Sequence, residues 1–255
     1  MTGNRENDLE TAANLLLDAR RTNTPIADLP EALRPTNLEE VYAIQDAIAE
    51  AYGEIGGWKI GAPTPEATPL FAPMPRIWIG ASGGVLSGKH WRYRGLEAEI
   101  AFLVGEDLLP RATPYTREEA LAAMASCHPA IEILESAFVD PMVVAKFAGF
   151  ADMQIHGGFI YGPAIENWHA IDFSKESVTL SVDGVVRVER TGSNTSGDLV
   201  KLIPWLANEG AARTGGLRKG QWITTGSWTG NTPASKDARV DVEFSTAGHV
   251  ELQFA

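Results

Sequence analysis

The sequence predicts an α+β fold, a mixed, mostly antiparallel β-roll or barrel with a helical subregion at its N-terminus. Apolar residues recur at helical spacing in the first fifth of the chain, whereas short apolar runs broken by Gly and Pro follow Gly53. No linker-like stretch interrupts the 255 residues. We therefore expect a single domain over residues 1–255, with residues 1–55 as the helical subregion and residues 56–255 as the β-rich part.

The helices are predicted from apolar spacing and from start signals. The first is expected over residues 8–21, a short one after Asp140, and a longer one over about residues 197–213 although Pro204 lies inside it. Two further starts carry the capping-box pattern, a hydroxyl residue followed three positions later by Glu: Thr36 with Glu39, and Thr116 with Glu119.

The strands are predicted from short apolar runs such as "GGWKIGA", "PRIWIGA", "LEAEIAFLV", "PAIEILES" and "GGFIYG". The segment "VTLSVDGVVRVE" is typical of a hairpin, because Asp183-Gly184 is a preferred two-residue turn. The C-terminal part "WITTG…ARVDVEFSTAGHVELQF" predicts three more strands with a tight turn at Gly248.

Composition excludes several classes of function. The net charge of −12, from 21 basic and 33 acidic residues, argues against binding to nucleic acid or to an anionic membrane surface. Cys127 is the one cysteine and is expected to be a small buried residue, which fits a reducing cytoplasm. No stretch approaches the ~20 apolar residues of a membrane span, and no N-terminal targeting pattern is present. We therefore expect a cytoplasmic protein without a membrane partner.

Three acids stand in apolar surroundings. In "GLEAEIAF", strand alternation places Glu97 and Glu99 on one face, opposite Leu96 and its apolar neighbours. In "PAIEILES", Glu132 lies between two isoleucines. Because these acids form an all-oxygen set with no nearby thiol or histidine, they suit Mg²⁺ or Mn²⁺ better than zinc or copper.

The same residues allow simpler interpretations. Glu97 and Glu99 could form the solvated face of an edge strand, and Glu132 could form a salt bridge with an arginine. Lys59 is the one charge in the glycine-bounded run "GGWKIGA", where it could extend its amine into solvent or bind a substrate carboxylate near a metal.

Ordered blocks add a resemblance that covers nearly the whole chain. The blocks "GWKIGA", "GLEAEIAFLVGEDL", "HPAIEILES" and "LRKGQWITTGSWTG" are similar in order and spacing to those of the fumarylacetoacetate hydrolase superfamily. Within it, the chain resembles the branch of 2-keto-4-pentenoate hydratases and 4-oxalocrotonate decarboxylases, as do the N-terminal segments "RRTNTPIADLPEALRP" and "YAIQDAIAE".

The resemblance implies a divalent metal held by Glu97, Glu99 and Glu132, with Lys59 as the family's substrate-side lysine. It also implies a homo-oligomer that acts on small 2-oxo or 2-hydroxydienoic acids, whose carboxylate and 2-oxygen bind the metal so that an enolate is stabilised. The favoured reaction is hydration. Decarboxylation, C–C bond hydrolysis and a non-catalytic protein that binds a metal or a 2-oxo acid are the alternatives.

Two departures from the branch pattern bear on the reaction. Pro73 in "LFAPM" stands where hydratases usually carry an acid, and Ile155 in "DMQIHG" stands at their usual serine. His156 is the candidate replacement for the missing proton-transfer group. In "TTGSWTG", Ser227 and Thr229 are expected to bind the substrate carboxylate, although a plain glycine turn explains the pattern too.

Overall fold

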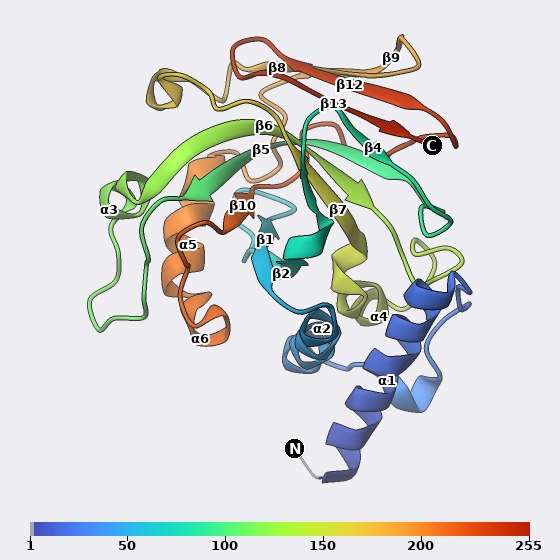
Figure 1. Ribbon diagram of the computed structural model, residues 1–255. Coiled ribbons are helices and arrows are strands. Elements are labelled where there is room, and N and C mark those ends of the chain that lie inside the picture. The colour runs from blue at the N-terminus through green and yellow to red at the C-terminus, as the bar shows by residue number, and fades with distance from the viewer. Residues whose placement is uncertain (1–2) are drawn as a thin grey trace.

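The computed structural model describes residues 3–255, which form two β-sheets with an apolar core between them (Figure 1). The strands are β1 (Ile55–Gly61), β2 (Leu70–Pro75), β3 (Ile79–Ala81), β4 (Gly84–Leu86), β5 (Gly95–Val104), β6 (Met124–Leu134), β7 (His156–Tyr161), β8 (Ser177–Val182), β9 (Val185–Thr191), β10 (Trp222–Thr224), β11 (Thr232–Pro233), β12 (Arg239–Phe244) and β13 (Gly248–Phe254).

The sheets are mixed and mostly antiparallel. Within residues 3–255, the larger sheet has eight strands, in the order β2-β1-β10-β5-β6-β7-β3 with β11 paired to β5, and the smaller has five, in the order β4-β13-β12-β8-β9. The parallel pairs are β1 with β10, β3 with β7, and β4 with β13. Because the larger sheet ends at β2 and β3 in this part of the chain, it is an open roll and not a closed barrel. The predicted α+β class is confirmed.

Strand β5 lies inside the larger sheet, between β10 and β6. Its apolar residues Leu96, Ala98, Ile100 and Phe102 are fully buried and belong to the core that the two sheets share. The alternate residues face the other way. The interpretation of Glu97 and Glu99 as the face of an edge strand is therefore wrong.

The predicted helical subregion is confirmed, and it packs beside the larger sheet in a second apolar cluster together with α4 (Figure 1). The α-helices are α1 (Gly3–Thr22), α2 (Leu38–Tyr52), α3 (Arg117–Ala122), α4 (Lys146–Ala151), α5 (Leu202–Asn208) and α6 (Ala211–Thr214). The 3₁₀ helices are η1 (Glu31–Leu33), η2 (Arg76–Trp78), η3 (Met153–Ile155), η4 (Trp168–Ala170) and η5 (Leu199–Lys201).

The N-cap of helix α2 lies one residue later than predicted. Asn37 is the N-cap, and its side chain accepts a hydrogen bond from the backbone N–H of Glu40. The Glu40 carboxylate accepts from the N–H and hydroxyl of Thr36 and forms an ion pair with Arg5 of α1 at 2.6 Å. The capping box predicted from Thr36 and Glu39 is thus wrong in register, because an amide side chain next to the threonine takes the capping position.

Other local predictions divide into confirmed and corrected ones. Thr116 and Glu119 form a complete capping box, and Asp183-Gly184 connects β8 to β9 with both φ angles positive. The helix expected over residues 197–213 is instead η5, α5 and α6. Pro204 is tolerated because it lies in the first turn of α5, where its missing N–H is not needed. Within residues 3–255, no helix combines the length and apolar character that a membrane span requires.

Candidate metal centre

Three glutamates converge on the face of the larger sheet that points away from the smaller one. Glu97 of β5 lies directly opposite Glu132 of β6 in the antiparallel ladder, and Glu99 is two residues further along β5. One carboxylate oxygen from each lies within 4.8 Å of the others. Glu99 and Glu132 are each 1% exposed. The three glutamates that the sequence analysis selected as metal ligands therefore lie together in the structure.

Lys59 of β1 points to the same cluster. Its Nζ donates to Glu132 Oε1 at 2.6 Å and to the backbone carbonyl of Gln154 at 3.1 Å. The alternative predicted for Glu132 was a salt bridge with an arginine. Glu132 does form a salt bridge, but its partner is Lys59. Because an ammonium group has three donors, one N–H of Lys59 has no partner among the described residues and can meet a substrate oxygen.

His156 also contacts the Glu132 carboxylate. Its Nδ1 lies 2.8 Å from Glu132 Oε1 and the ring is fully buried. Since an ionised carboxylate can only accept a hydrogen bond, Nδ1 carries the proton. Burial lowers the pKa of His156, although Glu132 opposes this effect. The ring is therefore neutral, and its Nε2 has no hydrogen-bond partner within residues 3–255.

A left-handed turn delivers both the Gln154 carbonyl and His156. Met153, Gln154 and Ile155 all have positive φ angles of 50–56°, a region in which a β-branched residue is a rare outlier. The Ile155 carbonyl accepts from the Glu135 N–H at 2.8 Å, which fixes the end of the turn against the residue that follows β6.

The electrostatics of the cluster are strongly coupled. Burial, with a contribution from Glu132, raises the pKa of Glu97 to about 7 and that of Glu99 well above its ordinary value. Burial acts on Glu132 in the same direction, but Lys59 and His156 outweigh it and lower the pKa of Glu132 to about 2. Burial acts to lower the Lys59 pKa, and the three carboxylates reverse that effect and raise it. The two glutamates of β5 thus lack a positive partner of their own.

The donor set fits a hard divalent cation. When the three carboxylates are ionised and Lys59 is protonated, the cluster carries a charge of −2, since His156 is neutral. Glu132 Oε2 is buried without a hydrogen-bond partner among residues 3–255, although its other oxygen has two. A buried unpaired carboxylate oxygen is costly, and a Mg²⁺-like ion with oxygen ligands would satisfy it.

The end of β10 and the loop that follows it support Glu99. The Thr224 hydroxyl donates to Glu99 Oε2, and the Gly226 N–H donates to the same oxygen at 2.9 Å. Sequence reasoning chose Ser227 and Thr229 from this loop and missed Thr224, although the shared "TTGSWTG" block contained it. Ser227 and Thr229 both line the cavity. Ser227 acts to lower the pKa of Glu97, and the Thr229 hydroxyl accepts from the Ala98 N–H.

The carboxylates lie in a cavity of about 790 Å³. Two exposed cations, Lys146 and Arg190, also line it. An adjoining recess of about 520 Å³ is largely apolar and includes Met142, Phe150 and Ile155. The site therefore combines a charged end with an apolar one, as expected for a small organic acid.

Of the two residues that depart from the branch pattern, Ile155 lines the apolar recess described above. Pro73 is buried in β2, opposite Trp58 of β1, and does not line the cavity.

Asp152 is fully buried, and Arg20 of α1 donates to it at 2.6 Å and to the His156 carbonyl at 3.0 Å. Arg20 therefore links the helical subregion to the backbone of the site.

Comparisons with known proteins show the family and agree with the fold. Residues 40–254 match the family described as fumarylacetoacetate (FAA) hydrolase C-terminal. The chain is 24% identical to TodF product hydratase of Pseudomonas putida F1 over 98% of this chain and 97% of the relative. It is 28% identical to 2-keto-4-pentenoate hydratase of Paraburkholderia xenovorans LB400 over 86% and 84%. The structure of 4-oxalocrotonate decarboxylase from Pseudomonas putida G7, complexed with magnesium and adipate, has a similar fold with a TM-score of 0.84, 21% identity and 97% coverage of both chains.

Proposed function

We propose, from the premise that this chain belongs to the fumarylacetoacetate hydrolase family, that it is a divalent-metal-dependent lyase of the 2-keto-4-pentenoate hydratase type. Its substrate is a small 2-hydroxydienoic or 2-oxo-enoic acid, to which it adds water. The convergence of Glu97, Glu99 and Glu132 with Lys59 in one cavity is the observation that carries the proposal. The names of the hydratase relatives support it.

The metal, Mg²⁺ or Mn²⁺, would be held by Glu97, Glu99 and Glu132. The related decarboxylase is complexed with magnesium in one structure and with calcium in another, which supports a divalent cation here. When bound, such a cation supplies the positive charge that favours the enolate form of a 2-oxo acid.

The remaining residues bind and orient the substrate. The unpartnered N–H of Lys59 donates to an oxygen of the substrate, and the raised pKa keeps this ammonium group protonated. Ser227 contributes a hydroxyl to the cavity wall from the loop after β10. His156 acts as a positioning residue, because its N–H fixes one oxygen of Glu132 while the other oxygen stays available. The apolar recess takes the hydrocarbon part and excludes water from it.

Decarboxylation of a 4-oxalocrotonate-like acid is the second candidate. Within the described chain, the acids that line the cavity and its recess are the three proposed ligands. Beyond these three, the described residues of the lining offer no carboxylic acid at the hydrocarbon end of the substrate to move a proton. Decarboxylation leaves the same enolate and needs no activated water, so this observation favours it over C–C bond hydrolysis.

The test is to incubate the protein and Mg²⁺ with 2-hydroxypenta-2,4-dienoate and follow the loss of its conjugated absorbance. We expect turnover that disappears in the Glu97→Gln variant. Release of CO₂ from an oxalocrotonate-like acid without hydration would reject the hydratase assignment. No turnover with a panel of 2-oxo acids, together with intact Mg²⁺ binding, would indicate a non-catalytic binding protein. We also propose a homo-oligomer, which sedimentation velocity tests.

A further inference from the structure

A second cavity, of about 430 Å³, lies at the edge of the larger sheet near the C-terminal end of α1. Strand β3 pairs with β7 through Phe159–Tyr161, so the preceding glycines of β7, Gly157 and Gly158, are not covered by β3. Both glycines line the cavity. A Cβ on Gly158 would lie 2.9 Å from the Trp91 ring.

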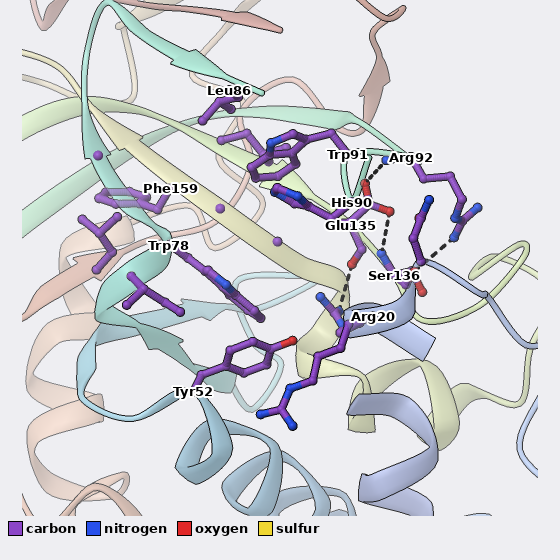
Figure 2. A pocket seen from close by; sticks show the side chains of 18 of the residues that line it. Arg20, Tyr52, Trp78, Leu86, His90, Trp91, Arg92, Glu135, Ser136 and Phe159 are labelled. Atoms are coloured by element: carbon purple, nitrogen blue, oxygen red, sulfur yellow. Dashed lines mark hydrogen bonds between the residues drawn. The ribbon is translucent and has the colours of Figure 1, made fainter. Parts of the chain in front are cut away.

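The walls of this cavity are aromatic. Figure 2 shows Trp78 and Tyr52 on one side of the β7 ribbon and His90 and Trp91 on the other. The Tyr52 and Trp78 rings pack 4.6 Å apart between centroids, and the His90 and Trp91 rings are also 4.6 Å apart. Ligand sites have volumes in this range and similar linings, and flat aromatic walls favour a planar unsaturated ligand.

The charged groups of the cavity sum to about one positive charge. Arg20 is neutralised by its ion pair with Asp152. Glu135 accepts hydrogen bonds from the backbone N–H groups of Arg92, Tyr93 and Ser136. The Arg92 guanidinium donates to the backbone carbonyls of Ser136 and Phe138 instead, so its charge offsets that of Glu135 only in the sum over the lining.

Arg21 is the remaining charged residue of the lining. Its guanidinium donates to the Ala51 carbonyl at 3.0 Å and lies 5.6 Å from the centre of the Tyr52 ring. Within residues 3–255 it forms no ion pair. The cavity thus carries a surplus of about one positive charge next to an aromatic wall.

The cavity is separate from the candidate metal centre. Among the described residues, none lines both this cavity and the one that holds the carboxylates. The fully buried His156 ring lies between them, 5.7 Å from the Trp78 ring on one side and 2.8 Å from Glu132 on the other. A ligand here would not meet the three glutamates.

We propose that this cavity is a second ligand site, which takes a small planar aromatic monocarboxylate. The ring packs between Trp78 and Trp91 against the glycine edge of β7. The carboxylate pairs with Arg21, whose unused N–H donors suit a planar carboxylate. The match between a net charge of about +1 and one carboxylate favours a monoanion over a dianion or a neutral ring.

Benzoate is the probe, and the full-length chain is titrated with it by calorimetry and by tryptophan fluorescence. The Arg21→Gln variant tests the cavity, since this exposed side chain makes a single hydrogen bond to the protein. The double variant Lys146→Gln/Arg190→Gln is the matched control, because it removes exposed cations from the carboxylate cavity instead. Benzyl alcohol, which lacks the charge, tests the role of the carboxylate.

We expect one benzoate per chain, quenched tryptophan fluorescence, and a Kd that rises roughly tenfold in Arg21→Gln, as for the loss of one charge-assisted hydrogen bond. The control variant should bind benzoate like the wild type, and benzyl alcohol should bind more weakly. The proposal is overturned if the wild type shows no saturable binding of benzoate. That result is expected if a second copy of the chain fills the cavity. It is also overturned if only the control variant loses affinity.

Discussion

Replacing Arg20 by Met should strongly destabilise the protein, although Arg20 contacts none of the three carboxylates. Its side chain is 6% exposed and that of Asp152 is 0% exposed. Its guanidinium also donates to the backbone carbonyls of Glu135, Asp152 and His156. Met matches the length of Arg20 but leaves the Asp152 carboxylate buried without its cation, and such a loss costs about 3–5 kcal/mol.

Thermal and urea unfolding measure this effect. For a chain of this size the cost corresponds to a Tm lower by roughly 10 °C. Arg34→Met is the control, because its ion pair with Asp28 is 39% and 25% exposed, and exposed pairs contribute about 0–1 kcal/mol. The Arg20→Met/Asp152→Asn double variant removes the stranded charge and should recover about 1 kcal/mol or more. A cost below about 1 kcal/mol for Arg20→Met, or simple additivity in the double variant, would refute the reasoning.

Three further predictions concern the metal centre, the helical subregion and β7. Glu97→Gln removes one of the three proposed oxygen ligands and should weaken Mg²⁺ binding at least ~10-fold by calorimetry, and unchanged affinity would reject the proposed ligand set. The hydrogen bond from Arg5 of α1 lowers the pKa of Glu40 from 4.5 to about 2. Glu40 should therefore contribute about 2–3 kcal/mol to the free energy of unfolding above pH 4.5, and this contribution is lost as the pH falls through about 2. The free energies that urea unfolding gives for wild type and Glu40→Gln should therefore converge in acid. Gly157→Ala places a Cβ 2.3 Å from the Glu135 side chain and should cost about 3 kcal/mol, whereas Gly61→Ala, with 3.7 Å of clearance, should cost much less in the same assay.

Part of the site follows from strand periodicity because β5 is regular. Alternation alone puts Glu97 and Glu99 on one face, and the structure has them there. Alternation does not fix the register between strands. The direct pairing of Glu97 with Glu132 depends on how β5 and β6 meet, which short-range sequence signals do not specify.

The contacts that hold Glu132 could not be predicted for a different reason. His156 and the Gln154 carbonyl reach Glu132 and Lys59 through three consecutive left-handed residues. Left-handed backbone is usually signalled by Gly or Asn, and "MQI" contains neither. Tertiary contacts impose this turn, so local propensity gives no sign of it.

The strain of that turn connects the helical subregion to the chemistry. Left-handed residues other than glycine cost about 1–2 kcal/mol each, so the Met153–Ile155 turn persists only because its surroundings fix it. Arg20 does this from α1, by binding the Asp152 carboxylate before the turn and the His156 carbonyl after it. Lys59 does it from β1, through the Gln154 carbonyl. Because the same His156 places Glu132, a weaker hold on the turn should loosen the ligand set as well as the fold. The helical subregion is thus coupled energetically to the proposed metal centre, although it supplies none of the three carboxylates.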